Sequence, residues 1–213
     1  MALEIFGRKT SSNVQSVMWA VAELGLEHTR HDVGGAFGKT DTPEYRAMNP
    51  MGLVPAVKDG DLALFESNAI VRYLGAQYGD ESFWPTDPAT RAKLDIWAEW
   101  TKTTLYQTLI PGIFWTLIRT KKVDQDAAKL ASLIEQIGGL MKMVEARLGD
   151  ADYLGGDTLS FADIIFGHTL YRYYTLDFER ASTPALDAYY ERLKARPAYV
   201  EHVMVDYSSM KVE

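Results

Sequence analysis

Apolar and polar positions follow two different spacings in the first 78 residues of the chain. Val14, Val17, Met18, Val21 and Leu24 recur every three or four residues, which is typical of one face of an α-helix. Short apolar runs bounded by turn residues are instead typical of strands. The pattern predicts strands at residues 3–6, 27–33, 54–58 and 62–65, and helices at residues 13–24, 43–48 and 67–78.

The pattern changes near residue 79. Residues 79–87 have no periodic apolar spacing and predict a linker. After the linker helical spacing dominates, and Pro88 suits the first turn of a long helix that reaches about residue 120, with a bend near Pro111. Further helices are expected at residues 126–148, 161–176 and 184–195, with a short one from Pro197. We therefore expect an α/β domain over residues 1–78 and an all-helical domain over residues 88–213.

Composition and charge exclude several classes of partner. The net charge is −7 and the basic residues are scattered, so we expect no nucleic-acid partner. The chain has no cysteine, and its four histidines lack the spacing of metal ligands, so we expect no metal. No apolar run approaches the roughly 20 residues of a membrane span, and the N-terminus lacks the features of a signal peptide. We therefore expect no membrane partner and a cytoplasmic location.

A proline inside a predicted strand marks the first unusual motif, NPMGLVP at residues 49–55. Proline removes a donor from the hydrogen-bond ladder, so Pro55 belongs at a sheet edge or in a special turn. One interpretation is a trans proline on an edge strand. The other is a cis bond that leaves the N–H and C=O of Val54 free to pair with an extended, peptide-like ligand. On the dipeptide alone the trans interpretation is favoured, since only about 5–6% of bonds before proline are cis.

The second motif, Glu66-Ser67, stands at the start of the helix predicted over residues 67–78. Ser67 is a good N-cap residue, and capping the helix is its simplest role. The same helix start also gathers unpaired N–H groups, which favour a bound carboxylate. Glu66 beside it would accept an ammonium group. A carboxylate and an ammonium on one ligand describe the end of an α-amino acid.

The third motif, Thr10-Ser11-Ser12-Asn13, joins the first strand to the first helix. One of these residues suffices to cap the helix. The remaining hydroxyl groups would face the crevice at the carboxyl end of the strand, where a hydroxyl can donate a hydrogen bond to a bound thiolate. No histidine and aspartate lie nearby in sequence to make a serine the nucleophile.

Together these motifs resemble the cytosolic glutathione transferases, in particular the bacterial, theta/phi-like, serine-type members. The resemblance covers essentially the whole chain. It implies a thioredoxin-like N-terminal domain followed by a helical-bundle C-terminal domain, a homodimer, and a site in the cleft between the domains. It is carried by SSNV (11–14), GL (25–26), NPMGLVP (49–55), ESNAI (66–70) and SFADI (160–164).

The resemblance also implies roles for individual residues, with glutathione as co-substrate. Val54, before a cis Pro55, would pair its backbone with the cysteinyl part of glutathione, and Glu66 and Ser67 would hold the γ-glutamyl end. Ser11 would donate to the sulfur, with Ser12 or Asn13 as substitutes if the loop is shifted by one residue.

The activity implied is activation of the glutathione thiol as a thiolate for attack on a small hydrophobic electrophile. The alternatives are a glutathione-dependent peroxidase, isomerase or dehalogenase, and a non-catalytic ligand carrier or interaction protein of the same fold. Disulfide reduction is disfavoured, because the family members that perform it usually carry a cysteine that this chain lacks.

One position departs from the family pattern. Leu53 stands where the family often has a lysine, arginine or glutamine that reaches the glycyl carboxylate of glutathione. Lys39 is the expected replacement, and the alternative is a solvated lysine in an exposed loop.

The pocket for the electrophile has the weakest sequence signal. Tyr106, Ile110, Phe114 and Trp115 recur at helical spacing, which is typical either of a core face or of a pocket wall. The resemblance favours the pocket, with Arg8 and Thr10 at its border. We expect Trp97, Arg119 and Arg172 to be structural, and Ser160 with Asp163 to form a capping box that stabilises the helical domain.

Overall fold

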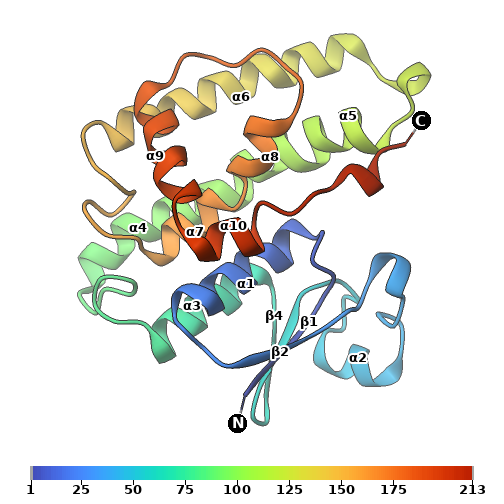
Figure 1. Cartoon of the computed structure of the whole chain (residues 1–213), viewed down its shortest axis with the longest axis vertical. Coiled ribbons are helices and arrows are strands. Elements are labelled where there is room, and N and C mark those ends of the chain that lie inside the picture. Colours follow the sequence, from blue (N-terminus) through green and yellow to red (C-terminus); the bar gives the residue numbers. More distant parts are fainter. Residues whose placement is uncertain (1, 213) are drawn as a thin grey trace.

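The computed structural model describes residues 2–212 and shows a small sheet with its helices beside a larger array of helices (Figure 1). The sheet has the strand order β2-β1-β3-β4, with β1 parallel to β2 and antiparallel to β3. This arrangement confirms the expected thioredoxin-like domain followed by a helical one. The strands are β1 (Leu3–Phe6), β2 (His28–His31), β3 (Ala56–Asp59) and β4 (Leu62–Phe65), and the helices of this domain are α1 (Ser12–Glu23), α2 (Pro43–Met48) and α3 (Ser67–Tyr78).

Side chains along each strand point alternately to the two faces of the sheet, and helices cover both faces. Leu3 and Ile5 point to one face, where α1 and α3 pack against each other. Phe6 points to the other face, where it packs with Tyr45 of α2 and Ala56. The two central strands are therefore covered on both sides.

Two strands are shorter than the sequence suggested. β2 covers only His28–His31 of the expected residues 27–33, and β3 begins at Ala56 rather than at residue 54. The late start of β3 has a simple cause, because Pro55 has no N–H to donate to the ladder.

The expected long helix from Pro88 is continuous, but its hydrogen-bond pattern changes from α-helical to π-helical along its length. α4 (Pro88–Trp100) passes into two wider, π-helical stretches, Thr101–Leu105 and Thr108–Phe114, and then into α5 (Trp115–Arg119). Pro111 lies inside the second stretch, where the helix is locally widened. The bend expected there stays a prediction.

The remaining helices are α6 (Ala127–Leu148), α7 (Phe161–Gly167), α8 (Leu170–Thr175), α9 (Pro184–Lys194) and α10 (Pro197–His202). The prediction of a single helix over residues 161–176 is wrong, because the helix breaks between α7 and α8. At the break the hydroxyl of Thr169 donates to the Phe166 carbonyl at 2.8 Å. Such a side-chain bond competes with the helical backbone pattern. Within residues 2–212 no helix is long and apolar enough to cross a membrane.

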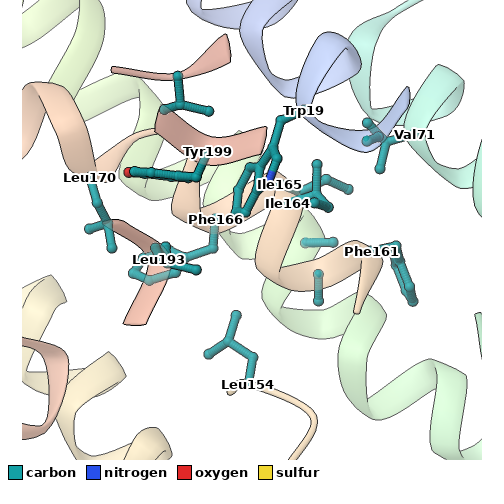
Figure 2. Packing of buried hydrophobic residues seen from close by; sticks show 14 of the residues in the cluster. Trp19, Val71, Leu154, Phe161, Ile164, Ile165, Phe166, Leu170, Leu193 and Tyr199 are labelled. Atoms are coloured by element: carbon teal, nitrogen blue, oxygen red, sulfur yellow. The ribbon is translucent and has the colours of Figure 1, made fainter. Parts of the chain in front are cut away.

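The larger hydrophobic cluster contains residues of both sets of helices (Figure 2). Trp19 of α1 is fully buried, and its ring meets that of Tyr199 in α10 edge-on, with 4.8 Å between centroids. Beside this contact Arg196 donates to both carboxylate oxygens of Glu23, at 2.8 and 2.6 Å. Because α1 belongs to the sheet domain and α10 to the helical domain, these contacts hold the two domains against each other.

The capping box predicted at the start of α7 is confirmed. Asp163 is fully buried and accepts four hydrogen bonds. The donors are the N–H groups of Leu154 and Ser160, both at 2.8 Å, the Ser160 hydroxyl at 2.7 Å and the Tyr189 hydroxyl at 3.0 Å. This carboxylate therefore ties α7, α9 and the preceding loop together.

His168, at the break after α7, is expected to make stability depend on pH. Burial and the charge of Arg172 lower the pKa of His168 to about 3. The native state thus keeps the ring neutral, whereas the unfolded state binds a proton below about pH 6.5. The stability that comes from keeping His168 neutral is fully present above that pH. Below it, the free energy of unfolding falls by up to about 1.4 kcal/mol per pH unit as pH decreases toward 3.

Chemical denaturation at several pH values between about 6.5 and 4 tests this expectation. The variant His168→Asn retains a polar side chain and removes the titration, so its stability should fall less steeply than that of the unmodified protein. Carboxylates titrate in both proteins, and the difference between the slopes isolates His168. Equal slopes would show that His168 does not have the low pKa described here.

Candidate functional site

The sheet register brings the three sequence motifs to one end of the sheet. Phe6 of β1 lies opposite Ala56 of β3, and Ala56 lies opposite Phe65 of β4. The loop that follows Phe6, the turn that precedes Ala56 and the helix start that follows Phe65 are therefore neighbours. These are the segments that hold Ser11, Val54 and Glu66.

The proline turn presents a free peptide edge. The bond between Val54 and Pro55 is cis. The Leu53 carbonyl accepts hydrogen bonds from the hydroxyl of Tyr45 at 2.6 Å and from the side-chain amide of Asn49 at 2.7 Å. Burial raises the pKa of Tyr45 to about 12, so its hydroxyl remains a donor. Within residues 2–212 the N–H and C=O of Val54 have no hydrogen-bond partner, so both are available to a ligand.

The structure corrects the role of Ser67. α3 begins at Ser67, and Glu66 occupies the position before it, so the prediction that Ser67 is the N-cap is wrong. Glu66 has a φ of 67°, and such a conformation in a residue other than glycine concentrates at functional sites. Ser67 is buried in the first turn, where backbone N–H groups lack helical partners. The Glu66 carboxylate lies 3.5 Å from the ammonium group of Lys102.

The two serines at the start of α1 differ in how their hydroxyl groups are engaged. Ser12 is buried, and its hydroxyl lies 2.9 Å from that of Tyr106 in the helical domain. Burial raises the pKa of Tyr106, so the phenol stays protonated in this pair. Ser11 is half-buried at the N-cap position, but its hydroxyl makes no capping hydrogen bond. Ser11 is therefore the serine whose hydroxyl is available to a ligand.

A cleft of about 570 Å³ opens between the two domains beside these groups. From the sheet domain it is lined by the expected Ser11 loop and by the proline turn. From the helical domain it is lined by the aromatic stripe that follows Tyr106. The expected residues that line it are Arg8, Thr10, Ser11, Ser12, Asn13, Leu53, Val54, Tyr106, Ile110, Phe114 and Trp115.

Four of the expected residues do not line this cleft. Pro55, Glu66 and Ser67 lie next to it at the end of the sheet, by the strand register. Lys39 is exposed, with a φ of 68°, and its neighbour Thr40 lines the cleft instead.

The sequence reasoning missed several lining residues. Arg119 and Arg172, which the sequence placed outside the pocket as structural residues, both line the cleft. Arg119 follows Trp115 by one helical turn, so extending the aromatic stripe would have found it. Arg172 and Met210 have no such signal, since α8 and the C-terminal segment are distant in sequence from the other lining residues and reach the cleft only through the tertiary fold. The other residues missed are Gly34, Gly35, Thr40, Gly52, Gln107 and Pro111.

The site holds no arrangement of metal ligands. Among residues 2–212 no group of three or more histidine, aspartate or glutamate side chains is placed to hold a metal ion. The groups that the cleft offers to a ligand are a free peptide edge, hydroxyl groups, an apolar wall and arginine side chains.

Two family models match the chain. Residues 1–76 match the N-terminal domain of glutathione S-transferase, and residues 105–197 match its C-terminal domain. The chain is 34% identical over 208 residues to the Glutathione S-transferase GstB of Escherichia coli strain K12, an alignment that covers 97% of this chain and 100% of the relative. It is 33% identical over 213 residues to the Probable glutathione S-transferase GSTF1 of Oryza sativa subsp. japonica, with 92% of this chain and 93% of the relative covered.

A solved structure has the same fold along nearly its whole length. The theta class glutathione S-transferase from Xanthomonas axonopodis pv. citri, with glutathione bound, superposes with a TM-score of 0.90 and 43% sequence identity. The superposition covers 96% of this chain and 98% of that one. The chain belongs to the glutathione S-transferase family.

Proposed function

We propose that this protein is a glutathione transferase that activates the glutathione thiol as a thiolate for attack on an electrophile. The observation that carries the proposal is the pairing, in one cleft, of the free peptide edge at Val54 with the unengaged hydroxyl of Ser11. The first suits an extended peptide and the second suits its sulfur. The relative from Escherichia coli is named for this activity, and the Xanthomonas structure contains glutathione.

Glutathione would lie along the end of the sheet. Its cysteinyl part would pair with the N–H and C=O of Val54 as an added strand. Its γ-glutamyl end would place the carboxylate at the N–H groups that begin α3, by Ser67, and the ammonium at Glu66. Leu53 is 62% exposed and apolar, so the glycyl carboxylate needs another partner, for which Lys39 in the neighbouring loop is proposed.

The chemistry follows from the environment of the sulfur. A free thiol has a pKa near 8.5, so it is mostly protonated at neutral pH. A hydrogen bond from Ser11 and the N-terminus of α1 both favour the thiolate, and a decrease of about two pKa units corresponds to roughly 2.7 kcal/mol. The thiol proton passes to solvent. The sulfur then bonds to the electrophilic carbon, and the leaving group departs with the electron pair.

The activity assay uses glutathione with a chlorodinitroarene and follows the absorbance of the thioether product. We expect a rate well above the uncatalysed reaction. A hydroperoxide and an isothiocyanate, assayed in parallel, test the peroxidase alternative and a second class of conjugation. Background rates with all three would contradict the proposal, and calorimetry that shows no glutathione binding would point to a carrier or interaction protein.

We also propose the assembly, the domain limits and the location. A homodimer is supported by the apolar side chains of Leu62 and Phe65, which are exposed on the edge strand β4. Sedimentation equilibrium would give twice the chain mass of 23.9 kDa for a dimer and that mass for a monomer. The division into residues 1–78 and 88–213, with a linker at 79–87, and the cytoplasmic location remain predictions.

A further inference from the structure

The cleft is cationic in a protein that is acidic overall. Arg8, Arg119 and Arg172 all line it, whereas none of the lining residues among residues 2–212 is an aspartate or a glutamate. The whole chain has a net charge of −7, so this concentration of positive charge is local. A recessed site with one sign of charge attracts ligands of the opposite sign.

The most buried of the three arginines has neutral partners within the described part of the chain. Arg172 is 2% exposed, and it donates to the side-chain oxygen of Gln15 at 2.8 Å and to the Thr10 carbonyl at 3.0 Å. Its guanidinium also lies over the rings of Phe114 and Tyr207, at 5.1 and 5.9 Å. Burial lowers the pKa of Arg172 to about 10, which leaves it charged at neutral pH. A buried cation usually has a carboxylate partner, because burial without one is costly.

The other two arginines come from opposite walls of the cleft. Arg119 stands at the end of α5 and lies over the Trp115 ring at 5.5 Å. Arg8 follows β1 and crosses Gly34 and Gly35 so closely that a Cβ on Gly34 would lie 3.1 Å from its Nη1. Burial, and then the charge of Arg119, lowers the pKa of Arg8. Among residues 2–212 neither arginine forms an ion pair, so both guanidinium groups are available.

We propose that the electrophile carries a carboxylate or a comparable anionic group, and that Arg8, Arg119 and Arg172 bind this group. The planar fork of a guanidinium matches a carboxylate with two parallel hydrogen bonds. Ile110, Phe114 and Met210 supply an apolar wall for the body of the substrate. This inference rests on the proposed transferase activity, and it names the class of substrate for the same site.

The carboxylates of glutathione do not account for these arginines. The proposed pose places the γ-glutamyl carboxylate at the start of α3 and the glycyl carboxylate toward Lys39. Neither Ser67 nor Lys39 is among the residues that line the cleft with the arginines. The thiolate of glutathione is another anion that the arginines could stabilise, because their positive charge would favour it as well. An experiment must therefore separate an effect on the sulfur from an effect on the electrophile.

A matched pair of electrophiles makes this separation. In para-(bromomethyl)benzoate and its methyl ester the sulfur of glutathione bonds to the benzylic carbon, the carbon–bromine bond breaks, and bromide leaves with the electron pair. Each rate is measured at saturating glutathione and divided by the uncatalysed rate of the same compound. We expect the corrected kcat/KM to be about tenfold or more higher for the carboxylate than for the ester.

Two single variants assign the preference to the arginines. Arg8→Gln and Arg119→Gln should each lower kcat/KM for the carboxylate by about tenfold and change that for the ester by less than about twofold. Arg172 also links α8 to α1 and is therefore left intact. Lys129→Gln is the matched control, because it removes one positive charge from an exposed position outside the cleft and should change neither rate.

The possible results distinguish a failure of the inference about the electrophile from a failure of the proposed transferase activity. Turnover of the ester without preference for the carboxylate would overturn the inference and leave the transferase proposal intact. Equal losses for both compounds in the arginine variants would also overturn it, and would assign the arginines to the thiolate. No acceleration of either compound by the unmodified protein would contradict the transferase proposal, and the inference with it.

Discussion

Replacing Ser11 by alanine is expected to lower kcat by a factor of about 100 to 1,000, while the affinity for glutathione changes little. The substitution removes one hydrogen-bond donor to a developing or fully formed anion in a recessed site. Losing one such donor typically lowers kcat by this factor. Affinity is expected to remain, because the peptide edge at Val54 and the start of α3 are unchanged by the substitution. Steady-state kinetics gives the first quantity, and calorimetry with glutathione gives the second.

Ser12→Ala is the matched control for Ser11→Ala. The Ser12 hydroxyl is paired with that of Tyr106, so its loss should reduce stability by about 1 kcal/mol and turnover by much less than the Ser11 substitution. An unchanged rate in Ser11→Ala would transfer the sulfur contact to Ser12 or Asn13. A large loss of glutathione affinity in Ser11→Ala would instead make Ser11 a binding residue.

Replacing Asp163 by alanine is expected to decrease the free energy of unfolding by about 3–5 kcal/mol. The substitution leaves the N–H groups of Leu154 and Ser160 and the hydroxyl of Tyr189 without an acceptor in the core. Each buried donor without a partner costs about 1–3 kcal/mol. Chemical denaturation measures the effect, and circular dichroism shows whether the variant folds.

Two further variants calibrate the loss at Asp163. Asp163→Asn keeps one acceptor oxygen and should cost less than the alanine substitution. Asp126→Ala removes the exposed N-cap of α6, where a single N–H of Lys129 loses its partner, and should cost only about 1 kcal/mol. If Asp163→Ala were no worse than Asp126→Ala, the buried network would not have the structural role assigned to it.

The sequence predicted the fold well because most elements carry local signals. Apolar spacing and the residue types at helix ends located α1, α2, α3, α6 and α9 within one or two residues of their observed limits, although Ser67 is not the N-cap of α3. The errors lie where a tertiary contact or a single backbone group determines where an element begins or ends. β3 begins late because Pro55 offers no N–H, and the helix after Phe161 breaks where the Thr169 hydroxyl bonds back to the chain.

The site was predictable in part for the same reason. Ser11, Val54 and Glu66 belong to short motifs in which backbone geometry and chemistry are encoded together. The helical spacing from Tyr106 to Trp115 also indicated one wall of the electrophile side, but α8 and the C-terminal segment, which add Arg172 and Met210 to it, are distant from that stripe in sequence. Arg172 therefore looked like an ordinary helical arginine, and only the fold places its guanidinium beside Phe114 and the start of α1.

The central claim is that the protein lowers the pKa of the glutathione thiol, and the ultraviolet absorbance of the thiolate tests it most directly. Glutathione bound to the unmodified protein is titrated against pH, with the protein alone and free glutathione as references. The account predicts a midpoint about two units below the value of about 8.5 for a free thiol, and a return toward that value in Ser11→Ala. A midpoint for bound glutathione that equals that of the free thiol would contradict the account.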